Sequence, residues 1–202
     1  GVMVSNQYQV ASALKQPERD EQGLVQAPED GWSFEDWPMA RGTVYPESMR
    51  RKLQEFRFHP LELTAEQCAP FIPNIDTIDS RDDERVLAFM KVLAETISVH
   101  GAGTSLLQLE PWDFGAVYFD GIDHFGHGFM RYHPPRLPWV SEEEIARYSE
   151  VVEGAYRLHD QMLGVYLELA GDDATVILVS DHGFHPDEAR LQTPSTGARG
   201  PG

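Results

Sequence analysis

Cysteine and basic residues are scarce in this sequence of 202 residues, and long hydrophobic runs are missing. The single cysteine, Cys68, has no partner for an internal disulfide. Only 16 Lys and Arg stand against 33 Asp and Glu, which gives a formal net charge of -17. Without a cationic surplus the chain is not expected to bind a nucleic-acid polymer or an anionic lipid surface. No stretch approaches the roughly 18 consecutive apolar residues that span a membrane. The composition is that of a soluble globular protein.

No export signal is visible in this sequence, so we expect a cytoplasmic protein, with an export signal upstream of this chain as the alternative. The chain opens on an apolar, β-branched run that resembles a strand entered midway, and residues 191–202 predict a low-complexity tail rich in Gly and Pro. Residues 20–80 have weak periodicity and indicate an irregular insertion or cap, with short helices at Pro46–Phe56 and after Thr64. We therefore predict one domain over residues 1–190, and both ends suggest a fragment of a larger fold.

From about residue 80 the hydrophobic pattern becomes regular. Apolar residues recur at spacings of four, three and four from Val86 to Ile97. This periodicity predicts an amphipathic helix over Asp82–Leu109, in which Gly101 and Gly103 would break or thin the second half.

Two apolar runs flank a second predicted helix. Phe114–Phe119 and the largely β-branched Ala174–Val179 are typical of buried strands. Between them, a capping box at Ser141 and Glu144 opens a helix that Gly171 closes. Strand, helix and strand form a βαβ unit, whose strands are parallel and whose crossover is right-handed. The sequence therefore predicts the α/β fold class.

Acidic and imidazole side chains follow each predicted strand. Asp123 and His127 come after the first strand, and Asp181 and His182 come directly after the second. Because the carboxyl ends of parallel strands open into one crevice, these pairs can serve two metal ions about 3.5–4 Å apart. Carboxylate and imidazole ligands favour Zn²⁺ and also suit Mn²⁺, and the lack of a nearby cysteine argues against a structural zinc site. The sequence therefore predicts a metal centre.

Four other titratable residues lie near these pairs or on the same helices. Asp120 either caps the loop or supports the site, while His124 and His185 either neighbour the ligands and substrate or face solvent. His159 lies on the core stripe of its helix, so we expect it to be packed and hydrogen-bonded.

Taken together, the two motifs resemble those of the type I phosphodiesterase/nucleotide pyrophosphatase family, within the alkaline phosphatase superfamily. Residues 123–127 match the family's Asp-x-x-Gly-His motif, and residues 180–183 match its Ser-Asp-His-Gly motif. Residues 128–136 resemble a bacterial branch of the same family. The resemblance covers residues 80–186 and implies a three-layer α/β/α sandwich with a mainly parallel sheet, of which this chain would hold a part.

The same resemblance implies a divided two-metal site. Asp123 and His127 would bind one ion and Asp181 and His182 the other, with a small phosphoester as substrate. In family members a Thr or Ser hydroxyl attacks phosphorus, and a further Asp and a late His complete the coordination. We find no matching pattern for these groups in this sequence, so the nucleophile and the two remaining ligands are expected outside this chain, which alone would be inactive.

Two interpretations stay open from the sequence. The first is a phosphodiesterase or pyrophosphatase enzyme whose remaining segments lie outside this chain, and the second is a truncated, non-catalytic relative with a partial metal site. Within the enzyme class, phosphomonoesterase, sulfatase and phosphotransferase activities use the same metal scaffold, and the sequence does not decide among them.

Overall fold

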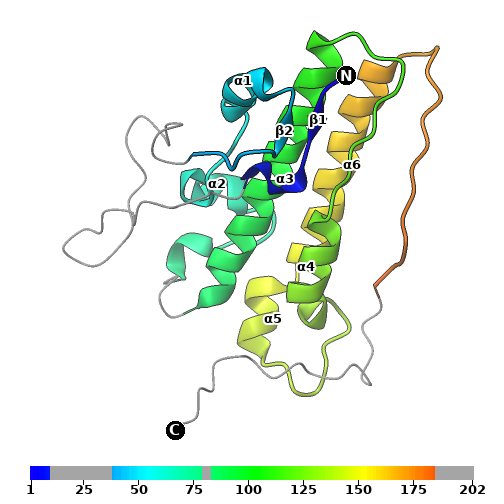
Figure 1. Ribbon diagram of the computed structural model, residues 1–202. Helices are drawn as coiled ribbons and strands as arrows, with labels where there is room; N and C mark the ends of the chain where they lie inside the picture. The colour runs from blue at the N-terminus through cyan, green and yellow to red at the C-terminus, as the bar shows by residue number, and fades with distance from the viewer. Residues whose placement is uncertain (10–37, 79–82, 185–202) are drawn as a thin grey trace, which may run out of the picture.

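The computed structural model describes residues 1–9, 38–78 and 83–184, and helices dominate it (Figure 1). The helices and strands follow in chain order as β1 (Met3–Val4), η1 (Asn6–Gln9), β2 (Val44–Tyr45), η2 (Glu47–Met49), α1 (Arg50–Gln54), η3 (Pro60–Glu62), α2 (Ala65–Cys68), η4 (Ile75–Thr77), α3 (Glu84–Leu109), α4 (Gly121–Phe129), η5 (Met130–Tyr132), α5 (Glu142–Tyr148) and α6 (Val151–Ala170). The long helices α3 and α6 pack together, and α4 contacts both of them.

The helix predicted over Asp82–Leu109 is confirmed as α3. It begins at Glu84, after Asp83 caps its first turn by accepting a hydrogen bond from the backbone N–H of Arg85. The two glycines in its second half do not interrupt it. A Cβ on Gly103 would lie 2.5 Å from the Tyr166 hydroxyl oxygen, so the missing side chain lets α6 approach closely.

By length and composition alone, α3 is also apolar enough to cross a membrane, a property that the sequence analysis assigned to no segment. One apolar face of α3 nevertheless packs inside the protein, where Val86, Phe89 and Leu93 are buried in the main core cluster. Core helices of globular domains have the same composition, and the absence of a membrane-spanning segment stays a prediction.

The second predicted helix is present as two helices, α5 and α6. The capping box is confirmed, because the Ser141 side chain accepts from the backbone N–H of Glu144 and the Glu144 side chain accepts from that of Ser141. Gly171 ends α6 with a positive φ of 68°, a conformation that favours glycine. The helix therefore starts and stops where predicted, with a break between Tyr148 and Val151.

The two predicted strands are not strands in the described part of the chain. Residues 114–119 and 174–179 form neither helix nor strand and pair with no other described segment, and Phe114 and Val179 are each 84% exposed. In Figure 1 the second of these segments runs as an extended trace from the end of α6. The sheet found among the described residues is the antiparallel pair β1–β2. The prediction of buried parallel strands is wrong for these residues, because an apolar run needs a backbone partner to form a strand.

The core has two clusters that meet α3 from different sides. The main core cluster combines α3, α4, α5 and α6 with residues 63–75, whereas the smaller one combines Tyr8 with residues around Met39, Leu53 and Ala102. The short helices predicted at Pro46–Phe56 and after Thr64 are confirmed as η2, α1 and α2. The described part of the predicted insertion thus contributes to the core. The predicted tail lies outside the described residues, and the domain boundaries stay a prediction.

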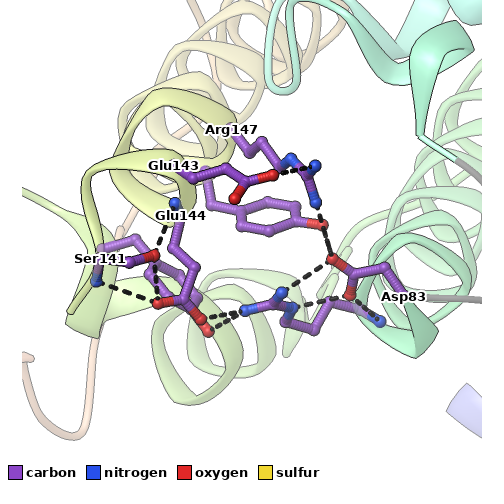
Figure 2. A network of polar contacts seen from close by, with 8 residues as sticks. Asp83, Ser141, Glu143, Glu144 and Arg147 are labelled. Atoms are coloured by element: carbon purple, nitrogen blue, oxygen red, sulfur yellow. Dashed lines mark hydrogen bonds and ion pairs between the residues drawn. The ribbon is translucent and has the colours of Figure 1, made fainter.

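A polar network joins the start of α3 to α5 (Figure 2). The buried Asp83 carboxylate accepts hydrogen bonds from the Arg85 side chain at 2.7 and 2.8 Å and from the Tyr148 hydroxyl at 2.5 Å. Arg85 also donates to Glu144 at 2.7 Å and to the Tyr132 hydroxyl at 2.8 Å. Its guanidinium carbon lies 4.7 Å from the centre of the Tyr148 ring. The network therefore ties three segments of the chain to one buried carboxylate.

His59 makes the stability of the fold depend on pH. Burial, together with the positive charge of Arg57, lowers the pKa of His59 from 6.5 to about 4, and its Nδ1 accepts a hydrogen bond from the backbone N–H of Leu61. The unfolded chain therefore binds more protons below pH 6.5. The part of the free energy of unfolding that depends on neutral His59 is fully present above pH 6.5. It falls as the pH drops toward 4, by about 2 kcal/mol between pH 6.5 and 5.

We expect His59→Asn, which keeps an acceptor for the Leu61 N–H, to remove this pH-dependent part of the stability. Urea unfolding of both proteins at pH 7.5 and 5 measures it, and equal pH dependence would contradict the role of His59.

Candidate metal centre

The first predicted ligand pair lies on a helix rather than in a loop. α4 buries Phe125 and Phe129, and the Phe125 ring packs 5.8 Å from the Phe89 ring of α3. Asp123 and His127 are four residues apart on another side of the same helix, where one helical turn brings their side chains together. The buried phenylalanines thus fix the helix and the direction in which the pair points.

The structure brings the two predicted ligand pairs together at the Asp123 carboxylate. The Nε2 atom of His127 lies 3.4 Å from Asp123 Oδ2, and the Nε2 atom of His182 lies 3.5 Å from Asp123 Oδ1. The two residues of the second pair are also close to each other, with His182 Nε2 3.8 Å from Asp181 Oδ2. Groups that are more than fifty residues apart in sequence therefore share one carboxylate. The carboxylate and the two imidazoles form the Asp123 cluster.

The segment that carries His182 is mostly exposed but is anchored beside α4. The Phe184 ring packs against the main core cluster and lies edge to face with the rings of His127 and His182. Asp181 itself is 91% exposed, and its Oδ1 accepts a hydrogen bond from the backbone N–H of His182. The Ser180 hydroxyl donates to the His182 carbonyl at 2.7 Å. These short-range bonds accompany a bend of the backbone at Asp181.

The chemistry of the Asp123 cluster fits a divalent metal ion. Asp123 Oδ1 is buried and accepts no hydrogen bond, a state that costs free energy unless a cation compensates it. Carboxylate oxygens and imidazole Nε2 atoms are ligands that Zn²⁺ and Mn²⁺ accept. Across residues 1–9, 38–78 and 83–184, no three His, Cys, Asp or Glu side chains are already arranged around one ion position. The residues thus supply the donors of partial sites.

The structure describes three of the four other candidates. Asp120 is the N-cap residue of α4 but its side chain makes no capping hydrogen bond, and His124 lies one turn further along the helix. His185 lies outside the described residues. His159 is packed as predicted: its Nδ1 lies 2.8 Å from the Ala155 carbonyl oxygen, and burial lowers its pKa. Its Nε2 would lie 3.4 Å from a Cβ on Gly121, the first residue of α4.

Glu95 of α3 is a neighbour of the site that the sequence analysis missed. Burial raises its pKa, the negative charge of Asp120 raises it further, and His124 acts in the opposite direction. Glu95 therefore extends the charged surroundings of α4 to α3. It is an acidic residue that follows the apolar run Val92–Ala94 on this helix, and a carboxylate beside buried apolar residues is the signal that could have identified it.

Comparison with known proteins places these residues in a family context. A family model described as type I phosphodiesterase / nucleotide pyrophosphatase matches residues 18–191, a span that contains both ligand pairs. No curated protein and no solved structure matches the chain significantly.

Proposed function

Because the chain belongs to the type I phosphodiesterase / nucleotide pyrophosphatase family, within the alkaline phosphatase superfamily, we propose that it serves in metal-dependent cleavage of a small phosphoester. The family is a class of phosphoester hydrolases. The observation that carries the proposal for this chain is the Asp123 carboxylate, which faces His127 and His182 and keeps a buried oxygen without a hydrogen-bond partner.

The proposed site uses two divalent ions, with Zn²⁺ favoured over Mn²⁺. Asp123 and His127 would hold one ion, and Asp181 and His182 the other. When bound, the ions would supply charge stabilisation for the phosphoryl group and its leaving oxygen. The chain's own part is to present the ligands. Each imidazole offers an Nε2 lone pair, and the carboxylates offset the positive charge of the ions.

The nucleophile is proposed to be a Thr or Ser hydroxyl outside this chain, with a further Asp and a late His completing the ion sites.

The proposed fold also extends beyond this chain. The family has an α/β fold, and we propose a three-layer α/β/α sandwich with a mainly parallel sheet, of which this chain forms a part.

A second candidate function is a non-catalytic relative that keeps a partial metal site. It is favoured by the finding that the described residues place no three potential ligands around one point. The coding sequence on either side of this chain distinguishes the enzyme from the non-catalytic relative. A strand followed by Asp and by Thr or Ser upstream, with a His downstream, would favour the enzyme, whereas stop codons in their place would favour the non-catalytic protein. Phosphomonoesterase, sulfatase and phosphotransferase activities are the alternatives within the enzyme class.

We further propose a cytoplasmic protein without a nucleic-acid or membrane partner, in keeping with its net charge of -17. A strongly acidic surface repels polyanions, whereas a small phosphoester needs only a local cationic centre such as bound metal.

Isothermal titration with Zn²⁺ tests the ligand assignment. We expect the chain to bind Zn²⁺ weakly, because water completes the coordination, and to lose this binding when His127→Ala and His182→Ala are combined. The matched control is His133→Ala, because His133 lies outside the Asp123 cluster and contacts the Pro134 carbonyl. The chain alone is expected to give no turnover of an aryl phosphodiester with added Zn²⁺. Binding that survives the double substitution would refute the assignment, and turnover lost in Asp181→Ala would show that the chain is active by itself.

A further inference from the structure

The Phe184 ring lies beside both histidines of the Asp123 cluster. Its centroid is 5.1 Å from that of His127, with the ring planes at 87°, and 5.7 Å from that of His182, with the planes at 70°. Both contacts are edge to face, an arrangement that aromatic rings favour over a face-to-face sandwich. One apolar ring thus touches an imidazole from each ligand pair.

Gly126 provides the surface on which this ring rests. A Cβ at this position would lie 2.7, 2.8 and 2.9 Å from three carbons of the Phe184 ring, closer than real Cβ contacts. Glycine is unfavourable inside a helix relative to alanine, and Gly126 lies within the nine residues of α4. The close approach of the ring gives a physical reason for a glycine here.

Phe184 also joins the site to the core. It packs against the main core cluster, which contains Phe125 and Phe129 of α4, whereas residues 176–183 just before it are exposed. His182 therefore lies on an exposed segment that is held to α4 by the ring two residues later. Without this anchor, the His182 side chain would lose its position beside Asp123.

We infer that Phe184 is a positioning residue, seated on Gly126, which holds the imidazoles of His127 and His182 at the Asp123 carboxylate. The inference rests on the proposed function only in taking these imidazoles as metal ligands. Its physical basis is preorganisation: a ligand that is already oriented loses less conformational freedom when it binds the ion. Phe184 and Gly126 then act as one unit, because either substitution removes the same contact.

A double-mutant cycle tests this unit through Zn²⁺ affinity. We expect Phe184→Ala to weaken Zn²⁺ binding about tenfold to a hundredfold, the range seen when a residue that supports a metal ligand is lost. Gly126→Ala is expected to weaken it similarly, because the new methyl group displaces the ring. In the Phe184→Ala background, Gly126→Ala should have no further effect. Gly128→Ala is the matched control, since a Cβ at Gly128 in the same helix meets nothing within 4 Å.

Nuclear magnetic resonance of the metal-free protein separates this inference from the proposed function. The Phe184 ring current should shift the imidazole protons of His127 and His182, and both shifts should vanish in Phe184→Ala and change in Gly126→Ala but not in Gly128→Ala. The His159 resonances serve as the reference for an intact fold. If Phe184→Ala does not fold, the two glycine variants carry the test alone. Unchanged imidazole shifts in Gly126→Ala, or additive effects on Zn²⁺ affinity, would overturn the inference, whereas absent Zn²⁺ binding with the expected shifts would overturn only the metal proposal.

Discussion

Asp123→Ala is expected to lower Zn²⁺ affinity by at least about 100-fold while leaving the metal-free protein as stable as before. The loss of affinity exceeds that for a supporting residue, because a direct ligand and its negative charge disappear together. Stability should change by less than about 1 kcal/mol, because the buried Oδ1 atom accepts no hydrogen bond and the His127 and His182 imidazoles, 3.4 and 3.5 Å from the carboxylate, are more than half exposed. Isothermal titration and urea unfolding in a chelator measure the two effects.

Asp160→Ala is the control for the Asp123 prediction. Asp160 is an exposed carboxylate of α6, so its removal changes the net charge equally without touching the Asp123 cluster. We expect this variant to bind Zn²⁺ like the unmodified protein. The combination of lost binding and retained stability is characteristic of a residue kept for function. An Asp123→Ala protein that binds Zn²⁺ within about threefold of the original, or that loses more than about 2 kcal/mol of stability, would make Asp123 a structural residue.

The helices were predictable because their signals are local. The capping boxes at Thr64 and Ser141 and the closing glycine at position 171 act within a few residues of the backbone groups that they serve. The break between α5 and α6 was not predicted. The apolar pattern continues through it, with Tyr148 and Val151 on its two sides both buried.

The two strands were predicted wrongly because strand formation depends on a partner segment that is distant in sequence. An apolar run such as residues 174–179 records which side chains avoid water, but its backbone forms a strand only beside a partner segment. The described residues contain no such partner, and the run remains extended and exposed. The sequence pattern therefore identified the apolar side chains of residues 174–179 but not whether a neighbouring strand lies beside them.

The sequence predicted that the two pairs would meet, and the structure places His182 beside Asp123, whereas their role as metal ligands stays a prediction. The pairs were expected on two loops at the end of a sheet, whereas Asp123 and His127 lie on α4 and only Asp181 and His182 lie in a segment that is neither helix nor strand. The four-residue spacing of the first pair is helical, and the neighbouring phenylalanines show the same spacing. Phe184 was missed as a functional residue, since an aromatic side chain after a motif normally indicates packing.

The largest loss of stability is expected from Asp83→Ala. This substitution leaves the Arg85 guanidinium and the Tyr148 hydroxyl without their shared acceptor in a mostly buried network (Figure 2). Breaking a buried ion pair by removing one partner costs about 3–5 kcal/mol. Arg85 is about a third exposed and keeps its bond to Glu144, so we expect the lower end of that range, about 3 kcal/mol. Urea unfolding at pH 7 measures the loss.

The pH dependence of the same substitution identifies its cause. Burial alone would raise the pKa of Asp83, but hydrogen bonds from Arg85 and Tyr148 outweigh burial and lower it. A carboxyl with a lowered pKa stabilises the folded protein above its unfolded pKa of 3.8, and this contribution is lost as the pH falls further. The difference in free energy of unfolding between the unmodified protein and Asp83→Ala should therefore become smaller in acid. The exposed pair Arg136–Glu142 is the control, since Arg136→Ala should cost less than about 1 kcal/mol. A similar cost for both substitutions would mean that the network adds no more than a surface ion pair, and that apolar packing alone holds α3 against α5.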